Sequence, residues 1–129
     1  MRAKSFVVML LMLAACVQMG DNLVVLREKD PKADNFTQAL AWEYLAYAES
    51  LAEEGRPLRA NYFAGKGLIA LEKGTVLLED KPALLKSRQA LTAVLTQDIK
   101  DIAPIKAARA QLLYDCWAEK EGLCKESFA

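Results

Sequence analysis

Residues 34–74, DNFTQALAWEYLAYAESLAEEGRPLRANYFAGKGLIALEKG, predict two helices joined by a tight turn and give the strongest indication of the fold. The first helix is expected to begin near Asp34 or Asn35, which are both good N-cap residues, and to stop at Gly55. Apolar residues that recur at steps of three and four predict its core face: Phe36, Leu40, Tyr44, Tyr47, Ala48 and Leu51.

The second helix is expected to open with Pro57 and to end at Gly74. It carries a small-residue face that permits close approach of a neighbour, and an apolar stripe on roughly the opposite side. The first comprises Ala60, Ala64, Gly67 and Leu71, and the second comprises Leu58, Tyr62 and Ile69. A helix that is apolar on two sides is usually packed between others. The pair also faintly resembles a tetratricopeptide hairpin, although a solenoid needs about three such repeats.

Two further helices are predicted downstream, beginning at Pro82 and at Pro104, the last one ending at Gly122. The expected buried stripe of the third helix is Leu84, Leu91, Leu95 and Ile102, with Val94 and Ile99 beside it. The core positions of the fourth are Ile105, Ala108, Leu112 and Cys116. No strand-forming alternation of useful length occurs here. The sequence therefore predicts an all-α bundle of about four helices over residues 34–129.

Residues 1–15 are predicted to be a lipoprotein signal peptide. Arg2 and Lys4 precede an apolar run over residues 6–15, which as a helix would reach about 15 Å, too short to span a membrane. The run ends in Leu13-Ala14-Ala15-Cys16, which is similar to the bacterial lipobox. Cys16 would then be acylated and become the new N-terminus. Two alternatives are an ordinary signal with a chance cysteine and an N-terminal hydrophobic anchor.

Residues 16–33 are expected to form a lipidated tether, because Asp30-Pro31 breaks any helix. Residues 22–26 are β-prone and fit a short docked extended piece. In bacterial lipoproteins an Asp after the lipidated cysteine resembles an inner-membrane retention signal. Val17 stands there in this chain, so the expected destination is the outer membrane, with the domain facing the periplasm.

Once Cys16 is assigned to lipid, Cys116 and Cys124 remain as an even pair. A disulfide is the default interpretation of such a pair in an oxidising periplasm. Two free buried thiols are one alternative. Half of a metal site is another, which the absence of histidine and of a second cysteine pair disfavours.

Neither the composition nor the motifs of the chain indicate a catalytic site. The chain has no histidine, which excludes imidazole-based triads and zinc motifs, and 17 basic residues balance 17 acidic ones, so no global field attracts nucleic acid. Three acidic pairs are interpreted as solvated: Glu53-Glu54, Glu79-Asp80, and Asp98 with Asp101. Gly65-Lys66-Gly67 lacks the rest of a P-loop. We expect no enzymatic activity, cofactor, metal, nucleic-acid partner or small-molecule substrate.

Trp42 is a candidate partner contact, together with Leu45. Helical geometry places Trp42 well outside the core sector of the first helix, among polar positions. The third or fourth helix, or residues 23–26, would cover it in one interpretation. In the other, Trp42 and Leu45 mark an exposed apolar spot for another envelope protein.

Three blocks resemble the N-terminal helical module of alphaproteobacterial OmpA-type outer-membrane lipoproteins. They are residues 36–49, residues 60–68, and residues 107–117 with the trailing Cys124, of which Asp115-Cys116-Trp117 is the most specific part. The resemblance implies an outer-membrane address, a helical fold and a Cys116–Cys124 disulfide. The peptidoglycan-binding domain that usually follows this module is not seen before Ala129, so that activity is not carried over.

These expectations combine into an outer-membrane-anchored periplasmic lipoprotein that acts as a structural or protein-interaction module of the cell envelope. Its partners would be the membrane, through lipid on Cys16, and another envelope protein. The alternative is a periplasmic regulator or inhibitor of a cell-wall hydrolase.

Overall fold

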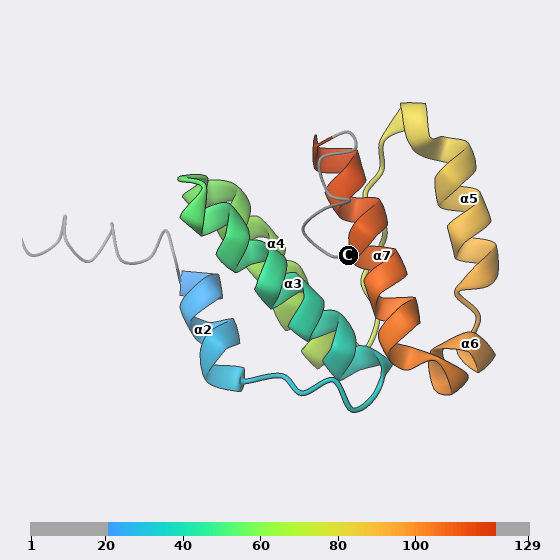
Figure 1. Ribbon diagram of the computed structural model, residues 1–129, viewed down its shortest axis with the longest axis horizontal. Coiled ribbons are helices and arrows are strands. Elements are labelled where there is room, and N and C mark those ends of the chain that lie inside the picture. The colour runs from blue at the N-terminus through green and yellow to red at the C-terminus, as the bar shows by residue number, and fades with distance from the viewer. Residues whose placement is uncertain (1–20, 121–129) are drawn as a thin grey trace, which may run out of the picture.

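The computed structural model describes residues 21–120, and within this range every regular element is a helix (Figure 1). The prediction of an all-α fold is therefore confirmed for the described part of the chain. In order, the elements are α2 (Asp21–Lys29), α3 (Phe36–Glu53), α4 (Pro57–Lys73), the 3₁₀ turn η1 (Pro82–Leu84), α5 (Leu85–Val94), α6 (Gln97–Ile102) and α7 (Pro104–Lys120).

The helical hairpin of α3 and α4 forms the centre of the fold, as the sequence predicts (Figure 1). Asn35 caps α3 by accepting a hydrogen bond from the backbone N–H of Gln38 at 2.9 Å. Gly55 and Gly74 each adopt a φ of 77°, a left-handed conformation that glycine tolerates, and so both helices end where expected. All six residues predicted for the core face of α3 are buried: Phe36, Leu40, Tyr44, Tyr47, Ala48 and Leu51.

Helix α7 packs along α3 and completes the main core. Ala108, Leu112 and Cys116 are buried at the predicted positions. Ile105, which was also expected in the core, is exposed instead. It lies in the first turn of α7, next to the short helix α6, which contributes no buried residue that would cover it.

Residues 22–26 do not form the short extended piece that the sequence allowed, because residues 21–29 form helix α2. Leu23 and Leu26 are buried at helical spacing against the hairpin. A Cβ atom added to Gly67 would lie 2.6 Å from Cδ2 of Leu26. Because glycine has no side chain, α2 can pack closely against the small-residue face of α4. The β-branched residues of this segment have a high strand propensity, but burial of its apolar face against the hairpin stabilises a helix instead. Asp30-Pro31 ends the helix as expected.

The expectation of one long third helix is also wrong. The chain forms η1 and α5, breaks at Leu95, and starts again as α6, where the Thr96 hydroxyl caps the new helix by accepting from the N–H of Ile99. Neither α5 nor α6 contributes a buried residue. Ile102 is 80% exposed, and Leu84, Leu91 and Leu95 are half-buried. Helix α5 lies beyond α7, away from the hairpin, which leaves its apolar face little to pack against (Figure 1).

Candidate functional site

The structure places the sequence-predicted site residues as follows. Cys16 and Cys124 lie outside the described residues, so lipid attachment and the expected pairing stay predictions. Cys116 is buried in α7 and is disulfide-bonded. Trp42 is 42% exposed on α3, so neither α2 nor α7 buries it, while Leu45 is half-buried against the core.

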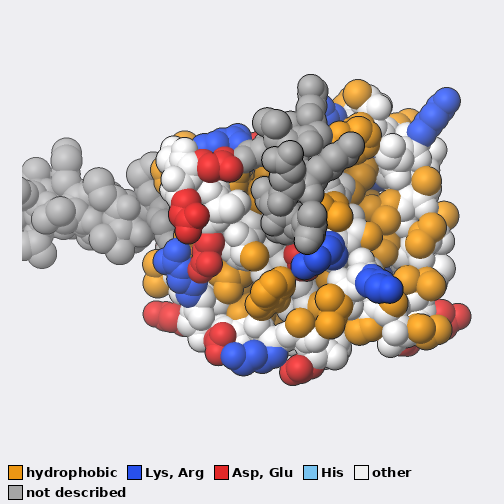
Figure 2. Space-filling model, viewed as in Figure 1, with side chains coloured by type: hydrophobic (Ala, Val, Ile, Leu, Met, Phe, Trp, Pro, Cys, Tyr) orange, Lys and Arg blue, Asp and Glu red, His pale blue; other side chains and the backbone are white. Residues whose placement is uncertain are grey.

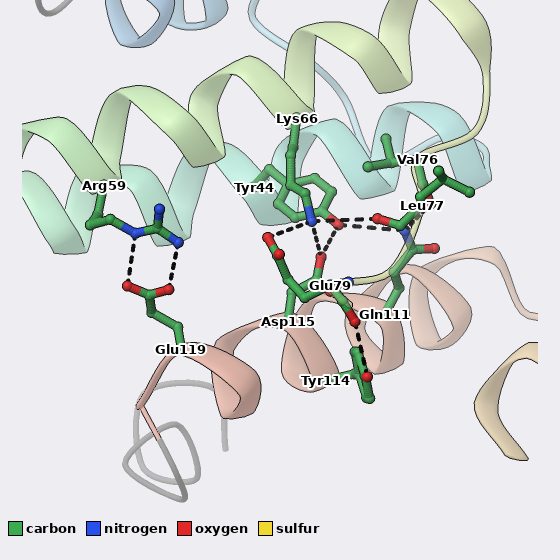
Figure 3. Close-up of polar contacts among 10 residues, drawn as sticks. All are labelled: Tyr44, Arg59, Lys66, Val76, Leu77, Glu79, Gln111, Tyr114, Asp115 and Glu119. Atoms are coloured by element: carbon green, nitrogen blue, oxygen red, sulfur yellow. Dashed lines mark hydrogen bonds and ion pairs between the residues drawn. The ribbon is translucent and has the colours of Figure 1, made fainter. Parts of the chain in front are cut away.

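A buried polar cluster gathers between α4, α7 and the connection from residue 75 to residue 81 (Figure 3). Its centre is Lys66 on α4, whose ammonium lies 2.9 Å from Asp115 Oδ2 and 2.9 Å from Glu79 Oε1. The same nitrogen donates to the carbonyl of Leu77 at 3.4 Å. The contact with Glu79 is an ion pair only, because Glu79 Oε1 has no hydrogen-bond partner among the described residues. Lys66 therefore acts as an ionic cross-link between α4, α7 and the connection.

Asp115 is the most deeply buried acid of the cluster, and no part of its side chain is exposed. Besides the ion pair, its Oδ2 accepts a hydrogen bond from the Tyr44 hydroxyl, and its Oδ1 accepts from the backbone N–H of Glu79 at 2.9 Å. Burial raises the pKa of this carboxyl above its ordinary value, although Lys66, Tyr44 and the Glu79 N–H all favour the charged form. The cluster thus holds a carboxyl group whose charge depends on its neighbours.

The cluster fixes the extended connection to the helices. Gln111 donates to the carbonyl of Val76 at 2.8 Å, and the Tyr114 hydroxyl donates to the carbonyl of Glu79 at 3.1 Å. Burial, with the Asp115 charge beside it, raises the pKa of Tyr44 well above its ordinary value, which keeps that hydroxyl a donor. Side chains thereby satisfy backbone groups of a segment that has no regular secondary structure.

Three further ion pairs, made by two acidic residues, hold α7 in place. Glu119 accepts from Arg59 Nε at 2.8 Å and from Arg56 at 2.9 Å, which joins the end of α7 to the start of α4. Burial acts to raise the pKa of Glu119, but these two guanidinium groups outweigh it and the pKa is lowered. Glu43 is buried on α3 and accepts from Arg109 of α7 at 3.2 Å.

The outer face of α4 borders a groove of about 860 Å³, which we name the α4 groove. Its apolar lining is the predicted second stripe of α4 with part of the connection, and its polar lining includes Lys66 and Glu79. The stripe residues Leu58, Tyr62 and Ile69 are all exposed, and Leu77 beside them is 82% exposed. The expectation that this stripe is packed against another helix is thus wrong for the described residues. Helix α2 instead covers the small-residue face.

Sequence reasoning missed Lys66 and Asp115, and it misjudged Glu79. The pair Glu79-Asp80 was expected to be solvated, but Glu79 is half-buried and bound to Lys66. A usable signal was present, since Asp115 lies three residues after the core residue Leu112 and so falls on the buried face of its helix. The other two acidic pairs are exposed, as expected.

Among residues 21–120, no helix is long and apolar enough to span a bilayer. Within the same range, no group of three or more acidic or cysteine side chains converges as metal ligands would. Comparison with protein-family models, curated proteins and solved structures gives no match for this chain.

Proposed function

We propose that this chain is an outer-membrane-anchored lipoprotein whose helical domain faces the periplasm and binds another protein of the cell envelope. The sequence before the described residues supports the anchor, because a charged start, a short apolar run and Leu13-Ala14-Ala15-Cys16 agree with a lipobox. The α3–α4 hairpin would serve as a single tetratricopeptide-like unit. The domain would have no enzymatic activity.

The observation that carries the interaction proposal is the exposed apolar stripe along the α4 groove. Leu58, Tyr62 and Ile69 recur at helical spacing on one face of α4, and Leu77 borders the same groove. Apolar residues in such a row normally face a core, and a contiguous exposed patch marks a site of interaction. An aromatic residue such as Tyr62 is typical of the few residues that dominate binding energy.

The buried cluster supports this use of the groove because it makes one wall rigid. The connection that carries Leu77 is held by Lys66, Gln111 and Asp115 rather than by regular secondary structure. A surface that is already ordered loses little conformational entropy when a partner binds. Trp42 and Leu45 on α3 provide a second candidate contact, since the indole is partly exposed.

Site-specific photo-crosslinking in intact cells tests the proposal. A photoreactive residue at Tyr62 in the full-length chain is expected to trap one discrete envelope protein, whereas the same residue at the exposed Glu53 of α3 serves as the matched control. The crosslink should disappear when Cys16→Ser prevents anchoring. A captured cell-wall hydrolase would favour the inhibitor version of the function. Equal or absent crosslinking at both positions would contradict the proposed surface.

A further inference from the structure

Helix α5 borders a second groove, which we name the α5 groove, on the other side of the connection from the α4 groove. Val76, Leu77 and Leu78 line both grooves, so the connection is the wall between them. The α5 groove has a volume of about 540 Å³ and lies between α5, the connection and Gln111 of α7. Figure 2 shows apolar side chains gathered at the surface on the α5 and α6 side of the molecule.

Helix α5 buries little apolar surface of its own. A ten-residue helix has marginal stability alone and normally depends on burying an apolar face. Within the described structure, α5 contributes no buried residue, and Leu95, which follows α5 directly, is half-buried in the lining of the groove. An apolar occupant of the groove would complete the core between α5 and the connection.

The charged side chains that line the α5 groove are both basic. Arg88 from α5 and Lys100 from α6 line it, and the described lining residues include no acidic side chain. The Nε atom of Arg88 is buried and has no hydrogen-bond partner among the described residues. An unsatisfied buried donor is costly, and a guanidinium binds carboxylates well. Lys100 is engaged differently, since its ammonium lies 4.7 Å from the centre of the Phe36 ring.

The size of the groove favours a small amphiphile over a protein. Arg88 and Leu95 are about 10 Å apart along the helix axis at the usual helical rise. A groove of this length is too short to bury the surface area that a stable protein–protein interface needs. The volume of about 540 Å³ falls within the range of roughly 300–1,000 Å³ that is usual for small-molecule sites, which are mostly apolar with few polar groups.

We propose that the α5 groove binds a medium-chain carboxylate, with its alkyl chain against Leu78 and Leu95 and its carboxylate on Arg88. This site shares the connection with the proposed partner surface, but it does not require that a partner binds there. It also goes beyond the sequence-based expectation, which foresaw no small molecule. Binding would add contacts that α5 lacks and would therefore slow its local opening.

Hydrogen exchange of the full-length protein in lipid nanodiscs tests the proposal, with sodium octanoate as the probe. Octylamine provides the same chain with the opposite charge, and acetate provides the charge without the chain. At free octanoate of twice the Kd, the amides of α5 are expected to exchange about threefold more slowly, by linkage. The amides of α3, which contributes no residue to the groove lining, should not change.

Two variants locate the carboxylate. Arg88→Gln should raise the octanoate concentration needed for half-maximal protection about tenfold, as the loss of one charge-assisted hydrogen bond predicts. Lys86→Gln, an exposed neighbour outside the groove lining, should behave as the unmodified protein. Protection by octylamine equal to that by octanoate would overturn the proposal. So would an unchanged response in Arg88→Gln, protection spread equally over α3, or the absence of protection.

Discussion

Replacing Lys66 with methionine removes the one cation from the buried cluster and preserves most of the aliphatic length of the side chain. Asp115 and Glu79 would then share a buried site without a counter-ion. Removing one partner of a buried ion pair costs about 3–5 kcal/mol, because the remaining charge is not compensated. We expect a loss near 3 kcal/mol at neutral pH, since the Lys66 side chain retains 10% exposure and some water access.

The loss should depend on pH in a defined direction. Lys66 opposes the burial that raises the Asp115 pKa, so its removal raises that pKa further. A carboxyl whose pKa is higher in the folded state than in the unfolded state favours folding when protonated, and stability falls as pH rises through the folded pKa. The slope is at most about 1.4 kcal/mol per pH unit for one proton. The deficit of the variant should therefore be smaller at about pH 5 than at about pH 7.5.

Urea unfolding followed by circular dichroism at both pH values measures the effect, with the unmodified protein at each pH as the reference. Lys73→Met is the matched control, because Lys73 is an exposed lysine on the same helix and should change stability by less than about 0.5 kcal/mol. Equal losses in the two variants would refute the structural role of the cluster. A Lys66→Met deficit that is the same at both pH values would refute the assigned role of Asp115.

The remaining predictions concern single side chains and one bond. Leu26→Ala should lower the free energy of unfolding in urea by about 2–5 kcal/mol, as truncation of a core side chain does. Val24→Ala, at an exposed position of the same helix, should lower it much less. Equal small losses in the two variants would mean that α2 is not docked on the hairpin. Trp42→Ala should cost less than about 3 kcal/mol, because the indole is only partly buried, and a larger loss would identify it as a core residue. Alkylation of the denatured, non-reduced protein should label neither Cys116 nor Cys124, and full labelling of both would exclude the disulfide.

The parts of the fold that the sequence predicted are those with strong local signals. Asn35, Gly55, Pro57 and Gly74 set the ends of α3 and α4 through capping and backbone conformation, which depend on few neighbours. The spacing of apolar residues then identified the buried face of α3. These features depend on the local chain, so they could be predicted without knowledge of the tertiary structure.

The features that the sequence did not predict depend on long-range contacts. Residues 21–29 are helical because Leu26 fits the space left by Gly67, about forty residues away in the chain, and local propensity does not contain that contact. Thr96 gave a local sign of a new helix start, but the apolar spacing around it favoured a continuous helix.

The candidate site was not predicted either, because it also depends on long-range contacts. Lys66, Glu79 and Asp115 are unremarkable separately, and burial by three different elements makes them a cluster. The pairing of a lysine with two acids so distant in the chain cannot be read from spacing. The exposed stripe of Leu58, Tyr62 and Ile69 was visible in the sequence as a second apolar face, but which face another helix would cover was not.

Intact-mass spectrometry of the protein purified from bacterial membranes tests whether the chain is lipid-anchored. We predict a mature chain that begins at Cys16 and carries the mass of covalently attached acyl groups, while a Cys16→Ser variant is neither lipidated nor cleaved there. A mature chain that begins at another residue, or an unmodified Cys16 in membrane-held protein, would show that this chain is not anchored by lipid on Cys16.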